Sequence, residues 1–256
     1  MNTLLELQGI RRSFGGRRGQ PAVAAVDGID LQVNEGTALG IVGESGSGKS
    51  TLGRIIVGLE KADAGTADFA GTRIVGSGRP RPRHLRRDLQ MVFQDPYSSL
   101  DPSWTIGSTL REPLRNFGIG RRGEWDDRVG DLLRRVGLDE QIAERLPSEL
   151  SGGQRQRVAI ARALAPEPRL IVADEAVSAL DVSTQAEIIN LLSRLREESR
   201  LTFIFISHDM SVVRHFSDYV AVMRHGQVLE VGSVRDVFED PEHEYTRQLM
   251  DAAPAL

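Results

Sequence analysis

The chain has 256 residues, a length that suits one large domain or two small ones. Its 32 basic and 36 acidic side chains give a net charge of −4, so it lacks the basic surplus of a protein that coats nucleic acid. It contains no cysteine, which excludes disulfides, cysteine-ligated metals and a thiol nucleophile.

The sequence shows no sign of a membrane span or of an export signal. No apolar run approaches the ~18 residues of a membrane-spanning helix. The first residues lack the basic region and the long apolar stretch of a signal peptide. We therefore expect a cytoplasmic chain that does not itself form a pore.

The N-terminal third predicts β-strands. Ile29, Leu31 and Val33 alternate with polar residues, which is the period of a half-buried strand. Residues 38–42 form a continuous apolar run, which is typical of a strand covered on both faces. A glycine-rich turn follows, and the next apolar residues share one face of a predicted helix: Leu52, Ile55, Ile56 and Leu59.

The turn at residues 43–50 matches the phosphate-binding pattern G-x-x-x-x-G-K-[ST]. Its glycines let backbone N–H groups face a phosphate without Cβ clashes, and the helix that follows adds the positive end of its dipole. Lys49 is predicted to reach the β- and γ-phosphates and Ser50 to ligate Mg²⁺. The alternative, a glycine-rich turn without a ligand, is disfavoured by the flanking strand and helix. The predicted phosphate-binding residues are Gly43, Glu44, Ser45, Gly46, Ser47, Gly48, Lys49, Ser50 and Thr51.

The next stretch, residues 71–87, is rich in arginine and contains two prolines. No aromatic residue is interleaved to stack on bases. We therefore predict a solvated surface loop in preference to a nucleic-acid patch. Residues 104–150 contain no strand-like run and are predicted to form a helical lobe of their own.

A second glycine-containing motif, Leu150-Ser151-Gly152-Gly153-Gln154, precedes a run that is compatible with a helix and stops at Pro166. A serine and two glycines at a helix start can bind an anion. They can also do no more than cap the helix. The residues of this motif by themselves leave both interpretations open.

Two later apolar runs, residues 170–173 and 202–206, predict buried strands, and helical segments precede both. Strands that alternate with helices indicate a parallel α/β sheet, which binds its ligands at the carboxyl ends of the strands. Asp174 follows the first run and is predicted to hold Mg²⁺, while Glu175 is predicted to orient or deprotonate the attacking water. The alternative is that this acidic pair only starts the next helix. His208 follows the second run. Residues 219–223 and 227–231 then predict a hairpin.

These motifs together resemble the nucleotide-binding subunit of an ATP-binding cassette (ABC) transporter, over essentially the whole chain. Residues 150–154 match the family's signature letter for letter, and residues 178–181 match its D-loop. Gln94 matches its Q-loop glutamine and His208 its switch histidine. Phe14 is the best match to the aromatic residue that stacks on adenine.

The resemblance implies an α/β fold of the P-loop NTPase ABC type, with a mainly parallel core sheet, an N-terminal antiparallel β lobe and a helical signature lobe. It implies a single ATPase domain over residues 1–256. The helical lobe is expected at about residues 95–155, and a C-terminal hairpin with a short extension at about residues 219–256.

In this family two domains meet head to tail, and each ATP lies between the phosphate loop of one domain and the signature of the other. The resemblance assigns catalysis to Lys49, Gln94, Glu175 and His208, and Mg²⁺ binding to Ser50, Gln94 and Asp174. It assigns contact with the partner's ATP to Ser151, Gly152, Gly153 and Gln154, and a place at the dimer interface to Asp181.

Three segments, residues 94–102, 177–183 and 243–247, resemble the ATP-binding subunits of oligopeptide and dipeptide importers. This resemblance implies a peripheral ATPase at the cytoplasmic face of the inner membrane that uses ATP and Mg²⁺. The implied partners are transmembrane permease subunits, a second ATPase (identical or related) and, indirectly, an extracytoplasmic solute-binding protein; nucleic acid is not among them.

The sequence leaves two further questions open. The side chains of Tyr97, Leu100 and Trp104 either dock a permease or belong to the local core. A soluble ABC-type ATPase without a pore is the alternative function, and membrane association discriminates it. A kinase that shares only the phosphate loop would leave residues 150–154 and His208 unexplained.

Overall fold

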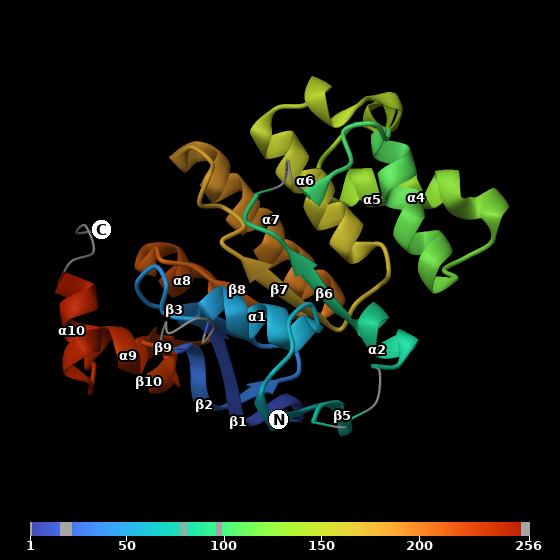
Figure 1. The fold of residues 1–256 in the computed structure, drawn as a ribbon. Helices are drawn as coiled ribbons and strands as arrows, with labels where there is room; N and C mark the ends of the chain where they lie inside the picture. Colours follow the sequence, from blue (N-terminus) through green and yellow to red (C-terminus); the bar gives the residue numbers. More distant parts are fainter. Residues whose placement is uncertain (1, 16–21, 77, 79–80, 96–98, 252–256) are drawn as a thin grey trace. The chain divides into compact units, whose positions relative to one another are not determined.

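The computed structural model of the chain describes residues 2–15, 22–76, 78, 81–95 and 99–251 (Figure 1). The chain divides into two compact units. The first unit is formed by Met1–Pro82 and Thr202–Leu256, and the second unit by Arg83–Leu201.

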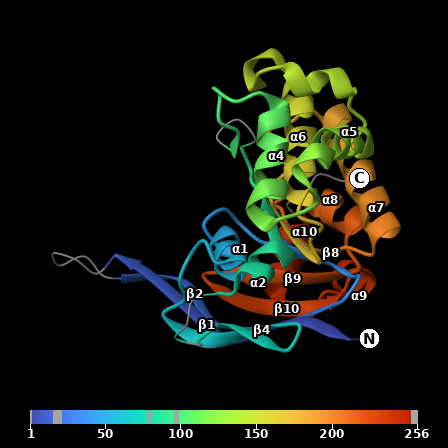
Figure 2. The same cartoon turned by 90° about the vertical axis from the view of Figure 1, so that its right-hand side faces the viewer.

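The first unit contains an antiparallel sheet in the order β2-β1-β4-β5. Its two long strands pair side by side along most of their length (Figure 2). The predicted alternation is confirmed, because Ile29, Leu31 and Val33 are all buried. The strands are β1 (Thr3–Gly15), β2 (Ala22–Asn34), β4 (Ala64–Phe69) and β5 (Thr72–Val75).

The first unit also holds a mainly parallel group of strands in the order β10-β9-β3-β8. Strand β3 is parallel to both β8 and β9, and β9 forms an antiparallel hairpin with β10. All residues of β3 and β8 are buried, as their unbroken apolar runs predict. The strands are β3 (Ala38–Val42), β8 (Thr202–Ile206), β9 (Tyr219–Arg224) and β10 (Gln227–Ser233).

Helix α1 (Lys49–Val57) follows β3 and packs against β8. Its predicted apolar face is confirmed for Leu52, Ile55 and Ile56, which are fully buried. The prediction for Leu59 was wrong, because that side chain is 60% exposed. Gly58 ends the helix in a left-handed conformation with φ +84°, so the chain turns away before Leu59 could extend the face.

The second unit contains two parallel strands, β6 (Leu89–Val92) and β7 (Leu170–Asp174). The helices α4, α5 and α6 follow β6 and precede β7 along the chain. These three helices pack against one another (Figure 1). The prediction that residues 104–150 are helical is confirmed by α4 and α5. The helices are α2 (Arg83–Asp88), α4 (Ile106–Phe117), α5 (Trp125–Arg135), α6 (Gly152–Leu164) and α7 (Val182–Ser199).

The prediction that the arginine-rich residues 71–87 form a solvated surface loop was wrong in part. It contains β5 and α2. In the first unit Arg73 pairs with Asp68 at 2.7 Å, and Arg81 donates to the carbonyl of Ile56 at the end of α1. The aliphatic parts and charges of these arginines therefore serve local structure. Arg79 lies outside the described residues.

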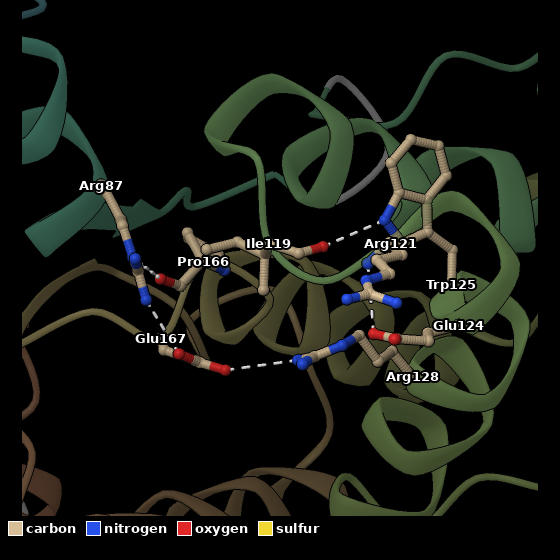
Figure 3. Close-up of polar contacts among 8 residues, drawn as sticks. All are labelled: Arg87, Ile119, Arg121, Glu124, Trp125, Arg128, Pro166 and Glu167. Atoms are coloured by element: carbon tan, nitrogen blue, oxygen red, sulfur yellow. Dashed lines mark hydrogen bonds and ion pairs between the residues drawn. The ribbon is translucent and has the colours of Figure 1, made fainter.

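Arg87 in the second unit joins a network of polar contacts around the chain that leaves α6 (Figure 3). Its guanidinium donates to the carbonyl of Pro166 at 2.7 Å and to the carboxylate of Glu167 at 2.8 Å. The other carboxylate oxygen of Glu167 pairs with Arg128 on α5 at 3.4 Å. These partly exposed ion pairs each contribute about 0–1 kcal/mol, so they orient the segment more than they stabilise it.

The end of the chain in the first unit forms α8 (Met210–Phe216), α9 (Val234–Glu239) and α10 (Glu244–Asp251). Glu230 on β10 holds the start of α10. Its carboxylate accepts hydrogen bonds from the amides of Glu242 and His243 and from the hydroxyl of Thr246. Within the described residues, no helix combines the length and the apolar character needed to span a bilayer.

The contacts of Glu230 predict a pH dependence of stability. Burial raises the pKa of Glu230, but the hydrogen bonds from Thr246, Glu242 and His243 lower it by more, so the pKa lies below its usual value of 4.5. Because the folded state favours the charged form, this stabilisation is fully present above the usual pKa and is lost as the pH falls through the lower pKa of the folded protein. The free energy of unfolding of the wild type should therefore approach that of Glu230→Gln in acid.

The measurement is denaturant unfolding of both proteins from about pH 7 to about pH 3. Glu197→Gln, at an exposed position on α7, serves as the matched control. A difference between wild type and Glu230→Gln that stays constant or grows in acid contradicts the prediction.

Candidate active site

The phosphate loop predicted from the sequence lies between β3 and α1 in the first unit. Two of its glycines are required by both conformation and space. Gly43 has φ +148°, and a Cβ there would lie 2.0 Å from the carbonyl oxygen of Met223. Gly48 has φ +104°, and a Cβ there would lie 2.0 Å from the carbonyl oxygen of Ala25. The loop is thus in close contact with the backbone of β2 and β9.

Hydrogen bonds also fix the outer side of this loop. The amide of Gly226, in the turn between β9 and β10, donates to the carbonyl of Ser47 at 2.9 Å. Within the loop, the amide of Ser47 donates to the carbonyl of Glu44 at 3.2 Å. The amide of Glu44 donates to the hydroxyl of Tyr245 on α10 at 3.2 Å. The loop is therefore held in shape by the C-terminal part of the chain.

Lys49 is only 4% exposed, although it is charged. Its ammonium donates to the carbonyls of Gly43 at 2.7 Å and Glu44 at 2.8 Å, and to the hydroxyl of Ser47 at 3.3 Å. A buried ammonium needs such partners, because an unsatisfied one is strongly destabilising. The charge is thereby fixed over the loop, where it can meet an anionic ligand.

Two further predicted residues lie in the first unit. His208 is exposed just beyond the carboxyl end of β8, before Asp209, which caps α8. Phe14 is on β1 and 42% exposed, and the guanidinium of Arg12 lies 4.7 Å from its ring centroid. The ring of Phe14 thus makes a cation–π contact with Arg12. The assignment of Phe14 to adenine stacking stays a prediction.

The acidic pair lies at the end of β7 in the second unit. Asp174 is the last residue of the strand and is 2% exposed. Glu175 follows with φ +48°, a left-handed conformation that costs a non-glycine residue roughly 1–3 kcal/mol and is concentrated at functional sites. The side-chain amide of Gln94 donates to the Glu175 carboxylate at 2.7 Å. The structure thus brings together two residues that the sequence singled out separately.

The alternative reading, that the acidic pair starts a helix, is wrong. Helix α7 begins only at Val182, and its N-cap is Asp181. The carboxylate of Asp181 accepts from the amide of Thr184 at 3.0 Å and from the hydroxyls of Ser183 and Thr184. The hydrogen bond from Ser183, followed by those from Thr184, holds the pKa of Asp181 well below its usual range. Asp174 and Glu175 are thus left for another role.

The signature motif does cap a helix, as one of its two readings predicts. The Ser151 hydroxyl accepts from the amide of Gln154 at 3.2 Å, and the Gln154 side chain accepts from the amide of Ser151 at 2.9 Å. This capping box does not exclude the second reading, because a hydroxyl that accepts a bond still has its O–H to donate. A Cβ on Gly153 would lie 2.7 Å from Cγ2 of Thr184, so this glycine lets α6 approach α7.

The donors predicted for Mg²⁺ are all oxygen atoms, which this hard cation prefers. They belong to Ser50, Gln94 and Asp174. Within the described ranges, no cluster of three or more His, Asp or Glu side chains could hold a metal by itself. In nucleotide sites, one or two side chains and the substrate phosphates hold Mg²⁺ together.

The structure gives different outcomes for the three residues that were predicted either to dock a permease or to belong to the local core. Leu100 is 3% exposed and therefore belongs to the local core. Trp104 is 37% exposed and remains a candidate for docking. Tyr97 lies outside the described residues.

No pattern in the sequence indicated that the C-terminal part supports the phosphate loop. Met223 and Gly226 contribute backbone atoms, which any residue has, so no side-chain pattern marks them. Tyr245 stood within a segment noted only for its resemblance to importer subunits. Its contact with Glu44 spans 201 positions in the sequence, so no local period could reveal it.

Comparisons with known proteins agree with this architecture. The family model described as "ABC transporter" matches residues 26–178. The glutathione import ATP-binding protein GsiA of Pectobacterium atrosepticum is 53% identical over 91% of this chain, and the match spans 37% of GsiA. The oligopeptide transport ATP-binding protein OppF of Lactococcus lactis subsp. lactis is 46% identical over 91% of this chain and 73% of OppF.

A solved structure shares the fold of the chain. The ATP-binding cassette MJ0796, in a dimeric post-hydrolysis state bound to ADP and Pi, superposes with a TM-score of 0.80. It is 32% identical in sequence, and the match covers 91% of this chain and 99% of that one. The predicted fold class, with a mainly parallel core, an antiparallel β lobe and a helical signature lobe, is therefore confirmed.

Proposed function

Because this chain belongs to the ABC transporter family, we propose that it is the ATP-binding and ATP-hydrolysing subunit of an importer for peptides or similar small solutes. The observation that carries the ATPase assignment is the hydrogen bond between Gln94 and Glu175 at the end of β7. The names of GsiA and OppF support import, glutathione being itself a small peptide.

In the proposed reaction, the phosphate loop and Lys49 bind the β- and γ-phosphates. The backbone amides of the loop, at the start of α1, supply hydrogen-bond donors and a positive dipole end, and the buried Lys49 ammonium supplies the full charge. Ser50, Asp174 and Gln94 would hold Mg²⁺, which would offset phosphate charge there. His208 is assigned to the γ-phosphate.

Glu175 orients or deprotonates the water that attacks the γ-phosphate. The amide of Gln94 holds one carboxylate oxygen at 2.7 Å, and the backbone at φ +48° fixes the direction of the side chain. A carboxylate that is prepositioned in this way does not have to be ordered during the reaction. Gln94 thus links the water-activating residue to the segment that leads into the helices α4 and α5.

Dimerisation is part of the proposal. Ser151 and Gly153, at the N-terminus of α6, would contact the γ-phosphate of the ATP held by a second ATPase subunit, identical or related. Asp181 is assigned to the same interface. The dimeric state of the neighbour MJ0796 supports this arrangement. ATP would then hold the dimer together, and hydrolysis would weaken it.

The proposed partners are transmembrane permease subunits, which place the chain at the cytoplasmic face of the membrane. The test is to tag Glu175→Gln, purify it from native membranes with ATP and Mg²⁺, and identify the co-purified chains by mass spectrometry. We expect two permease subunits. A second, related ATPase would define a heterodimer, and its absence a homodimer. Recovery only from the soluble fraction, without permeases, would overturn the importer assignment and leave the ATPase assignment standing.

A further inference from the structure

Tyr245 on α10 is in contact with the phosphate loop, and none of the roles described above uses it. Its side chain is 3% exposed, and its hydroxyl accepts a hydrogen bond from the amide of Glu44 at 3.2 Å. Glu44 is the second residue of the loop, directly after Gly43. A buried tyrosine generally places its hydroxyl against a polar partner, and here that partner is loop backbone.

The peptide group that Tyr245 contacts is also a partner of Lys49. The amide of Glu44 and the carbonyl of Gly43 belong to the same peptide unit, which is planar, and in its trans form the N–H and C=O point in opposite directions. The Gly43 carbonyl accepts from the Lys49 ammonium at 2.7 Å. The tyrosine hydroxyl and the lysine ammonium therefore hold this one peptide unit from opposite sides.

Tyr245 is itself fixed by a set of interactions. Its own amide donates to Nδ1 of His243 at 3.0 Å, and the guanidinium of Arg224 lies 4.4 Å from its ring centroid. The carboxylate of Glu230 accepts from the amide of His243 at 3.1 Å and from the hydroxyl of Thr246. Strand β10 thereby sets the position of the start of α10, and with it the direction of the tyrosine hydroxyl.

We propose that Tyr245 is a positioning residue for nucleotide binding, which locks the Gly43–Glu44 peptide and thereby the Lys49 ammonium in the orientation that receives the phosphates. This inference rests on the proposed function of the phosphate loop. Glu230 acts through Tyr245, because it anchors the segment that carries the tyrosine. A loop that is ordered before the ligand arrives loses less conformational entropy on binding, so the expected effect is on affinity.

The test compares Tyr245→Phe with the matched variant Tyr219→Phe in the full chain. Phenylalanine keeps the ring beneath Arg224 and removes only the hydroxyl. Tyr219 is half-buried on β9, and in the described part of the chain its hydroxyl makes no hydrogen bond. Calorimetry with MgADP measures the dissociation constant, ATP turnover gives KM and kcat, and thermal unfolding without nucleotide reports the fold.

We expect Tyr245→Phe to raise the dissociation constant of MgADP and the KM for ATP about 3- to 10-fold, which corresponds to the loss of one hydrogen bond. The kcat and the unfolding midpoint should stay near wild type, and Tyr219→Phe should match wild type throughout. An unchanged dissociation constant in Tyr245→Phe overturns the inference. So does a weaker affinity that Tyr219→Phe shares, or one that only accompanies a lower unfolding midpoint.

A double-mutant cycle tests the role of Glu230. If Glu230 acts through Tyr245, then Glu230→Gln weakens MgADP binding in the wild type but has no further effect in Tyr245→Phe. If the two substitutions instead weaken MgADP binding independently, so that the fold-changes multiply in the double variant, Glu230 does not act through Tyr245. Failure of the proposed function looks different, because the wild type itself would then show no MgADP binding that depends on Lys49.

Discussion

Replacing Glu175 with Gln is expected to reduce ATP turnover by about 10²- to 10⁴-fold, the usual contribution of a general base. In the wild type, the side-chain amide of Gln94 donates to the Glu175 carboxylate at 2.7 Å. Glutamine at position 175 has the same shape and retains an oxygen that can accept this hydrogen bond. It cannot take a proton from water. The nucleotide-binding groups remain, so the dissociation constant for MgATP should stay within about twofold of wild type.

Phosphate release at saturating MgATP measures turnover, and calorimetry measures binding. Glu197→Gln, an exposed and chemically identical change on α7, is the matched control and should behave as wild type. Turnover by Glu175→Gln close to that of wild type would remove Glu175 from the reaction. A parallel loss of MgATP binding would instead assign it to nucleotide binding.

Replacing Lys49 with Ala is expected to weaken MgATP binding by roughly 10²-fold or more, because hydrogen bonds to charged groups contribute about 1.5–3 kcal/mol each. Lys49 is 4% exposed, and its ammonium donates a hydrogen bond to the Gly43 carbonyl at 2.7 Å, so its position is fixed by the loop. Arginine is not an adequate substitute, because its larger planar group does not fit the space of a buried ammonium. We expect Lys49→Arg to bind poorly as well.

Lys61→Ala is the matched control, since Lys61 is exposed and is the other lysine of the chain. Calorimetry with MgATP gives the affinities, and the unfolding midpoint without nucleotide shows whether the variants fold. Binding by a folded Lys49→Ala within twofold of wild type would contradict the assignment of the phosphate loop.

Much of the local structure follows from short-range patterns. The apolar runs of β3, β7 and β8 and the turn before α1 depend on residues within a few positions of one another. The capping box at Ser151 likewise involves residues three positions apart. Short periods and spacings record such features directly. The end of α1 was misplaced although Gly58 stood in the sequence, because the apolar period runs past it.

The residues of the candidate site could be predicted from the sequence, but the contacts between them could not. Motif patterns identified Lys49, Asp174, Glu175 and Ser151, and the resemblance to the family added Gln94. Their roles remain predictions until the variants are measured. What the spacing did not reveal is which of these side chains touch one another and what supports them.

By itself, the sequence determined the family, the strands β3, β7 and β8 with the helix α1, and the chemical groups available for binding phosphate. Only the tertiary structure decided that Gln94 meets Glu175 across 81 positions and that Tyr245 meets Glu44 across 201. The physical reason is that such pairs depend on strand order and on packing between segments remote in the chain. Neither leaves a period in the sequence, because a single contact at long range requires only one suitable residue at each end.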